Sequence, residues 1–104
     1  MVTTEERKKA IRTMCESYVK KSPYVLNPDK ERVDFIINGL DRNEEKHGWR
    51  FCPCRIVTGD IKVDYKTICP CHWHKEEIKE QGFCKCILFT SEEWAKQKEK
   101  ELKW

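Results

Sequence analysis

Apolar side chains recur at helical spacing near the start of the chain. They occupy positions i, i+3, i+4 and i+7 of one stripe: Ile11, Met14, Cys15 and Tyr18. Thr4 suits a helix N-cap, so the pattern predicts a helix from there to about Lys20. We interpret Cys15 on this stripe as a small buried hydrophobic residue and not as a ligand.

A second stripe with the same spacing follows the segment SPYVLNPD, and it consists of Val33, Ile36, Ile37 and Leu40. Asn27 followed by Pro28 fits a cap followed by a first-turn proline, so this helix is predicted to begin there. We expect it to reach His47, where Gly48 can close it.

The middle of the chain favours shorter elements. Ile61, Val63 and Tyr65 alternate with polar residues after the turn signal TGD, which predicts a short strand. The segment HWHKEEIKEQG is typical of a short helix that ends at Gly82.

The end of the chain predicts a polar helix. Thr90 and Glu93 fit a capping box, and the helix is expected over about residues 91–104. It is almost entirely Lys and Glu, so we expect Trp94 to dock it against the rest of the protein. The patterns together predict a mainly α fold in one domain, residues 1–104.

The composition limits the size of the core and the classes of function open to this chain. The chain has 104 residues, 38% of them charged, and a mean hydropathy of −0.82. Its core must be small, so a crosslink or a metal would help to hold the fold. A net charge of +3, from 21 basic and 18 acidic residues, gives no indication of nucleic-acid binding. We expect a cytoplasmic protein, because no apolar run could serve as a secretion signal or span a membrane.

The cysteines of this chain indicate a chemical role. Six of the seven cysteines form three Cys-x-Cys pairs within residues 52–86. The pairs are Cys52 with Cys54, Cys69 with Cys71, and Cys84 with Cys86. In a reducing compartment, clustered cysteines more often bind metal or carry out redox reactions than form permanent disulfides.

The number six narrows the choice of chemistry. A zinc site or an iron–sulfur cubane takes four thiolates, which leaves two cysteines over. One iron–sulfur cluster and one dithiol that cycles with a disulfide would use all six. Two zinc ions would need further donors, for which His72 and His74 are close in sequence.

The order of these motifs resembles a known family. CPCR, CPC and a Cys-x-Cys pair followed by ILF, with DFIINGLDRNEEKHG before the first pair, resemble the catalytic (beta) subunit of ferredoxin:thioredoxin reductase. That family includes ferredoxin-dependent disulfide reductases of prokaryotes, and the resemblance covers about residues 8–90. It implies a small helical fold whose loops wrap around a [4Fe–4S] cluster.

The resemblance also implies a role for each clustered cysteine. The ligands of the cluster would be Cys52, Cys69, Cys71 and Cys84. Cys54 and Cys86 would form the redox-active disulfide, with Cys86 against the cluster and Cys54 as the more exposed nucleophile. Ferredoxin would donate single electrons, and thioredoxin or a similar protein disulfide would accept two. A second subunit or a homodimer is compatible with the sequence.

The sequence departs from the family pattern in two places. Lys85 stands where the family has a histidine, and the gap between Cys71 and Cys84 is longer. We hypothesise that His72 or His74 takes over proton transfer, and favour His72 because it directly follows a predicted ligand. The alternative is that both histidines lie on the surface. Lys85 either favours a nearby thiolate or faces solvent.

Other functional classes remain open from the residues alone. A structural zinc module would use the cysteines only to hold the fold. An electron-transfer protein would need only four cysteines, commonly in a C-x₂-C-x₂-C run that is absent here. A sensor could use the same cluster and disulfide to control a partner.

Overall fold

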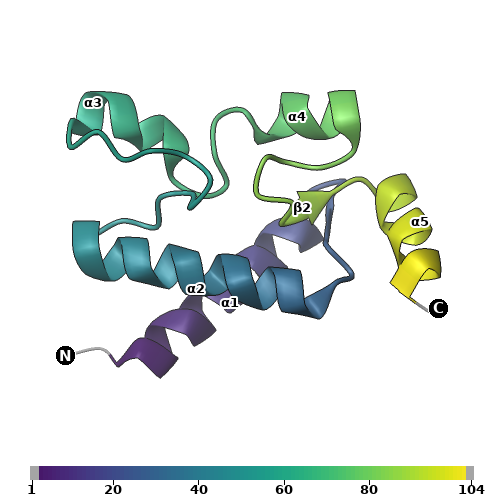
Figure 1. Cartoon of the computed structure of the whole chain (residues 1–104), viewed down its shortest axis with the longest axis horizontal. Helices are drawn as coiled ribbons and strands as arrows, with labels where there is room; N and C mark the ends of the chain where they lie inside the picture. Colours follow the sequence, from purple (N-terminus) through teal and green to yellow (C-terminus); the bar gives the residue numbers. More distant parts are fainter. Residues whose placement is uncertain (1–2, 103–104) are drawn as a thin grey trace.

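Two long helices form one side of the molecule. In the computed structural model, which describes residues 3–102, α1 covers Thr4–Lys20 and α2 covers Lys30–His47. α1 crosses behind α2 in the view of Figure 1. The apolar stripes of the two helices share one core, with buried Ile11, Cys15, Val33, Ile36, Ile37 and Leu40. Both predicted helices are confirmed, and so is the burial of Cys15.

The starts of these helices differ from the prediction. Thr3, not Thr4, caps α1, and its side chain accepts a hydrogen bond from a first-turn N–H. Asp29 caps α2 in the same way, so the prediction that Asn27 caps this helix was wrong. The predicted end of α2 is confirmed, because Gly48 adopts φ +83° immediately after His47.

A small antiparallel sheet joins distant parts of the chain. β1 covers Val25–Leu26 and β2 covers Phe89–Thr90, with Val25 paired to Thr90 and Leu26 to Phe89. Strands of two residues have no periodicity, which is why the sequence did not predict them. The sheet brings the chain that follows the last cysteine pair next to the start of α2.

Short helices lie on the other side of α2. α3 covers Ile61–Asp64 and continues into a 3₁₀ turn, Tyr65–Thr67, and α4 covers His74–Gln81. Figure 1 shows α3 and α4 above α2, with the connecting loops between them. The strand predicted over residues 61–65 was therefore wrong. The Asp60 side chain accepts a hydrogen bond from the Lys62 N–H and starts a helix there instead.

The remaining predictions concern α4 and α5. Gly82 has φ +91° and ends α4 as predicted. α5 covers Glu92–Leu102 and begins after Ser91, whose hydroxyl accepts a hydrogen bond from the Trp94 N–H at 3.1 Å. The predicted capping box with Thr90 was wrong, because Thr90 belongs to β2. The predicted last positions, 103 and 104, lie outside the described residues.

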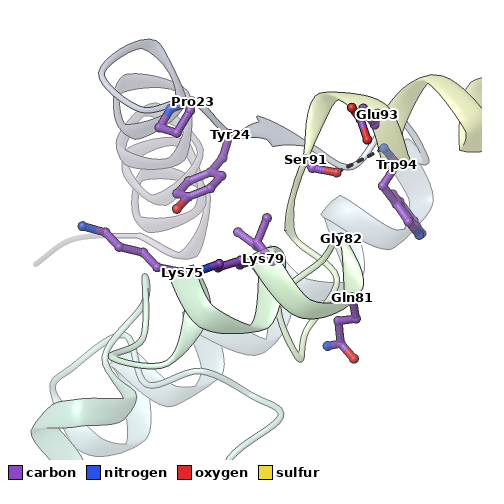
Figure 2. A pocket seen from close by; sticks show the side chains of 10 residues that line it. Pro23, Tyr24, Lys75, Lys79, Gln81, Gly82, Ser91, Glu93 and Trp94 are labelled. Carbon is purple, nitrogen blue, oxygen red and sulfur yellow. Dashed lines mark hydrogen bonds between the residues drawn. The ribbon is translucent and has the colours of Figure 1, made fainter.

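The α5 helix docks through its tryptophan, as predicted. The Trp94 ring lies 5.4 Å from the Phe83 ring, centroid to centroid, and packs over Gly82. A surface groove of about 600 Å³ lies beside this contact, between Tyr24, α4 and the start of α5 (Figure 2). None of the described residues that line it is a cysteine.

The helices described within residues 3–102 are each too short or too polar to span a lipid bilayer.

Asn27 anchors the loop that follows the last cysteine pair. Its side-chain amide donates to the Ile87 carbonyl at 2.9 Å, and its backbone N–H donates to the Leu88 carbonyl at 2.9 Å. Its side-chain oxygen accepts from the Asp29 N–H at 2.9 Å. Ile87 has φ +60°, which is strained for a β-branched residue, so the loop depends on such anchors.

We expect Asn27→Ala to lower the free energy of unfolding by about 1–3 kcal/mol, because it removes the side-chain partner of the Ile87 carbonyl. Chemical denaturation followed by circular dichroism measures this difference. Asn38→Ala, at an exposed position of α2, is the control and should change stability by less than about 0.5 kcal/mol. Equal effects of the two substitutions would contradict the anchoring role.

Candidate functional site

Three loops carry the three cysteine pairs. The first pair follows α2, the second lies between the 3₁₀ turn and α4, and the third lies between α4 and β2. The first two loops pair through their backbones: the Cys52 N–H donates to the Thr67 carbonyl at 2.7 Å, and the Cys69 N–H donates to the Arg50 carbonyl at 2.9 Å. The Cys84 N–H donates to the Phe89 carbonyl at 3.0 Å, so the third loop is attached to β2.

These loops enclose one cavity. The cysteines that line it are Cys52, Cys69, Cys71, Cys84 and Cys86. Ile36 and Leu40 of α2, with Leu88 and Phe89 from the other side, make its walls apolar. All four predicted cluster ligands are therefore brought to a single cavity, together with one of the two cysteines predicted to form the disulfide.

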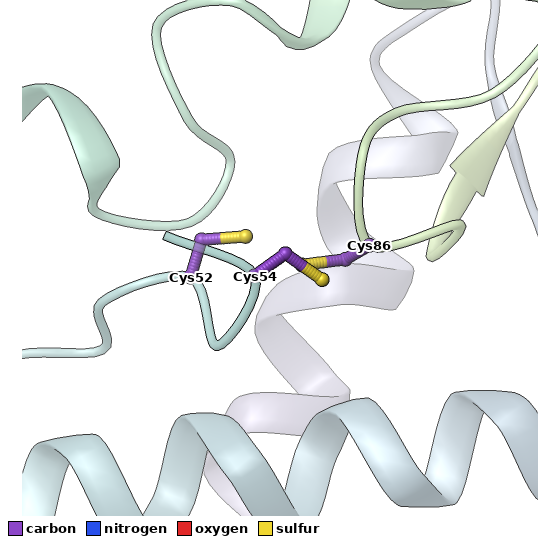
Figure 3. A group of neighbouring side chains, drawn as sticks. All are labelled: Cys52, Cys54 and Cys86. Atoms are coloured by element: carbon purple, nitrogen blue, oxygen red, sulfur yellow. The ribbon is translucent and has the colours of Figure 1, made fainter. Parts of the chain in front are cut away.

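The predicted disulfide pair lies at the edge of this cavity. The sulfurs of Cys52, Cys54 and Cys86 all lie within 4.8 Å of one another. Figure 3 shows the three side chains meeting where the first and third loops approach. All seven cysteines fall within the described residues and are free thiols, and Cys54 alone among them is not buried. The geometry thus places a half-exposed thiol and a buried thiol next to a predicted ligand.

Burial and hydrogen bonding shift the pKa values of the cavity thiols in different directions. Burial raises the pKa of Cys69 well above its usual value, and it also raises the pKa of Cys71 and Cys84. A hydrogen bond with the Cys86 thiol lowers the pKa of Cys52 to about 7, and the same contact raises the pKa of Cys86. Because metal ligation requires thiolates, metal binding at this cavity must displace protons.

The donor set fits a [4Fe–4S] cluster. Such a cluster is held by four cysteine thiolates, and here four buried thiols line an apolar cavity. A structural zinc ion almost always has four protein ligands. Within the described part of the chain, no fourth histidine, cysteine or carboxylate ligand atom joins Cys52, Cys54 and Cys86 at the 4.8 Å limit. Cys52, Cys54 and Cys86 therefore do not form a four-ligand zinc site.

The two histidines of the long gap lie in different environments. His72 is exposed, and its ring touches the edge of Trp73, with 5.6 Å between ring centroids. His74 is buried and lines the cavity. Its Nδ1 hydrogen-bonds the Cys71 carbonyl, and its Nε2 hydrogen-bonds the Tyr18 hydroxyl. The histidine favoured from sequence is thus outside the cavity, and its neighbour is inside.

Lys85, the other departure from the family pattern, is exposed. Its backbone N–H donates to a Glu77 carboxylate oxygen at 3.2 Å. Of the two interpretations from sequence, the solvent-facing one describes this side chain.

Gly39 was not identified from sequence, although it positions the first pair. It is buried on α2, and a Cβ atom there would lie 2.7 Å from Cβ and 2.9 Å from Cγ of Pro53. Pro53 separates Cys52 from Cys54, so the missing side chain at Gly39 lets the first cysteine loop approach the helix. A glycine in the middle of a helical pattern was the available signal.

The fold and the site together define a class: small helical proteins whose cysteine loops surround a thiol-lined cavity with an adjacent dithiol. A family model described as "Ferredoxin thioredoxin reductase catalytic beta chain" matches residues 2–103. The chain belongs to this family, so it is an oxidoreductase, and the resemblance found in its motifs is confirmed.

Individual relatives carry the same name. A catalytic chain of ferredoxin-thioredoxin reductase from Porphyra purpurea is 29% identical over 94 residues, which cover 88% of this chain and 75% of that protein. The one from Pyropia yezoensis is also 29% identical over 94 residues, covering 88% and 77%. The one from Synechocystis sp. is 29% identical over 85 residues, covering 79% and 68%.

We expect Gly39→Ala to weaken the site, even though alanine is intrinsically better than glycine in a helix by about 1 kcal/mol. Crowding against Pro53 should cost about 1–3 kcal/mol and displace the first cysteine loop. Unfolding curves and the rate at which a chelator removes iron from anaerobically purified protein measure the two effects. Asn38→Ala, one residue earlier, is again the control. A Gly39→Ala variant that is more stable than wild type, with unchanged iron loss, would show that the close approach is unnecessary.

Proposed function

We propose that this protein is a ferredoxin-dependent disulfide reductase. It would hold a [4Fe–4S] cluster through Cys52, Cys69, Cys71 and Cys84, next to a redox-active disulfide between Cys54 and Cys86. The observation that carries the proposal is the position of the Cys54 and Cys86 sulfurs, within 4.8 Å of each other and of Cys52, a lining residue of the cavity. Family membership supports the reaction class.

The two sulfurs differ in a way that assigns their roles. Cys54 is half-buried and can meet a large substrate, whereas Cys86 is only 2% exposed. The Cys54 thiolate attacks the acceptor disulfide and forms a mixed disulfide, and one acceptor sulfur leaves as a thiol. Cys86 then attacks Cys54, the mixed disulfide breaks, and the acceptor leaves with both sulfurs reduced. Two electrons and two protons return the enzyme disulfide to two thiols.

The buried cluster would connect a one-electron donor to this two-electron reaction. A [4Fe–4S] cluster, when bound, supplies single electrons. The chain itself excludes water from the cavity through its apolar walls and keeps Cys86 beside Cys52.

His74 is the side chain that we propose as the proton carrier. It lies in the cavity wall, and Tyr18, Tyr24 and Phe89 surround its ring. The Cys71 carbonyl can only accept a hydrogen bond, so Nδ1 must carry a proton in that contact. Nε2 meets the hydroxyl of the half-buried Tyr18, which connects the ring toward the surface. His72, the residue favoured from sequence, has no such position.

Large apolar side chains are exposed before and after Cys54 along the chain: Trp49, Ile56, Ile61, Val63 and Tyr65. Apolar exposure of this kind marks protein contact sites, so we propose a thioredoxin-like protein as acceptor and ferredoxin as donor. The relatives are named ferredoxin-thioredoxin reductase, which supports both. A second subunit, a homodimer and a cytoplasmic location stay predictions.

The first test is the composition of the anaerobically purified protein. We expect a brown protein with about four iron atoms per chain, as a [4Fe–4S] cluster requires, and two thiols that appear only on reduction. Cys54→Ser should keep the iron but lower acceptor reduction by about a thousandfold or more, because the nucleophile is lost. The control variant Cys15→Ala changes a cysteine outside the cavity, so it should keep both the iron and the reduction of the acceptor.

The rival classes give different results in the same experiment. Zinc in a colourless protein would indicate a structural module and overturn the proposal. Iron with full function after replacement of Cys54 and Cys86 would indicate an electron-transfer protein. A reversible cluster and disulfide without turnover of a protein disulfide would indicate a sensor.

Substitution of the histidines tests the proton carrier. We expect His74→Gln to change the pH profile of disulfide reduction, because a glutamine side chain does not carry a proton as a histidine ring can but still donates to the Cys71 carbonyl. The matched substitution His72→Gln should leave the profile unchanged. The reverse result would return the role to His72, and unchanged profiles in both variants would exclude both histidines.

A further inference from the structure

One ion pair connects all three cysteine loops. Arg55 directly follows Cys54, and its Nη2 donates to a Glu77 carboxylate oxygen at 2.8 Å. The other oxygen of Glu77 accepts from the Lys85 backbone N–H at 3.2 Å, one residue before Cys86. Glu77 therefore connects the residue after one predicted disulfide sulfur to the residue before the other.

The second loop fixes the arginine. The Arg55 guanidinium stacks over the Trp73 ring, 4.6 Å from its centroid, and its Nη2 lies 3.9 Å from the Cys71 sulfur. Trp73 and Glu77 both lie between the second and third cysteine pairs. Each CxC pair thus has a neighbour in this network.

The ion pair between Arg55 and Glu77 is largely buried. The side chains of Arg55 and Glu77 are 19% and 21% exposed, and the Arg55 Nε has no hydrogen-bond partner within residues 3–102. Glu77 is therefore the counter-charge of a largely desolvated guanidinium, and its loss would leave that charge uncompensated. Such a pair holds its geometry better than an exposed ion pair, whose two side chains move freely in water.

The connection exists while both thiols are free. No disulfide joins Cys54 to Cys86 in this structure, yet their sulfurs lie within 4.8 Å. The noncovalent link from Arg55 through Glu77 to Lys85 runs parallel to the disulfide that these cysteines would form. A link of this kind lowers the entropy cost of closing the disulfide, since the loops are already together.

We propose that Arg55 and Glu77 form a clamp that keeps Cys54 opposite Cys86 after the disulfide opens. This proposal rests on the proposed function. Both are positioning residues: they hold the loop ends so that Cys86 reaches Cys54, forms the Cys54–Cys86 bond and releases the acceptor sulfur as a thiol. Without the clamp, the loops separate more easily, the mixed disulfide lasts longer and the enzyme disulfide is less stable.

Glu77→Gln is the sharpest test, because the clamp uses two acceptor oxygens and an amide has only one. Anaerobic holoenzyme is equilibrated with oxidised and reduced glutathione, where two enzyme thiols and one glutathione disulfide give one enzyme disulfide and two glutathione thiols. Alkylation and mass measurement give the equilibrium constant. We expect Glu77→Gln to lower it about tenfold, which raises the disulfide potential by about 30 mV.

Glu76→Gln is the control, since Glu76 is the exposed neighbour of Glu77 on α4. It should match wild type in equilibrium constant, iron content and melting temperature. The clamp is supported if Glu77→Gln changes the constant while iron and melting temperature match the control. It is overturned if Glu77→Gln keeps the wild-type constant, or if Glu76→Gln changes it equally.

Two further measurements keep the test decisive. If Glu77→Gln loses iron, the Arg55→Lys variant is measured instead. Lysine keeps the positive charge but loses the planar stacking on Trp73. A wild-type equilibrium constant in this variant overturns the clamp. Wild-type protein is measured first, and if no thiol pair appears on reduction the proposed function fails. A normal wild-type pair with an unchanged constant in the variants means that only the clamp fails.

Discussion

Backbone hydrogen bonds between irregular loops are the constraint on which the site depends. The cysteine pairs lie outside regular helices, so the loops must be held by contacts with one another. The pairing of Cys52 with Thr67 and of Cys69 with Arg50 fixes the first loop against the second, and the Cys84 contact with Phe89 attaches the third to β2. The two-residue sheet and Asn27 then join this third loop to the base of α2. Of the two long helices, α2 contributes Ile36 and Leu40 to the cavity wall, and α1 shares its apolar core.

This arrangement also determines the electrostatics of the site. Five thiols line a cavity with apolar walls, where charged forms are poorly solvated, and the half-exposed Cys54 lies at its edge. At Cys52, hydrogen bonds with the Cys86 thiol and the Cys54 backbone, and then the Arg55 charge, outweigh burial and lower the pKa. Arg55 is itself balanced by Glu77. A low dielectric strengthens each of these interactions, so a change in one partner is transmitted to the others.

Sequence patterns predicted what depends on periodicity and residue chemistry. The two long helices, the short helix ending at Gly82 and the docking of Trp94 follow from apolar spacing and glycine signals, and the family follows from the three CxC motifs. Alternation at Ile61, Val63 and Tyr65 was misleading, because all three are exposed and lie in α3 and the 3₁₀ turn. The Asp60 cap was the better signal.

Other parts of the site could not be predicted because they depend on contacts between residues far apart in sequence. Nothing in the residue types distinguishes His74 from His72; His74 begins α4 and is buried, whereas His72 precedes the helix and is exposed. The link from Arg55 to Glu77 spans 22 positions. Gly39 matters only because Pro53 packs on it in three dimensions.

The difference in exposure between Cys54 and Cys86 has a consequence for oxidative damage. A peroxide that reaches the site meets Cys54 first, and a sulfenic acid formed there lies next to the buried Cys86 thiol. The two condense to a disulfide with loss of water, which prevents further, irreversible oxidation of either sulfur. That product is the same disulfide that the proposed catalytic cycle opens. In that cycle, an accidental oxidation at Cys54 would return the protein to its own resting form.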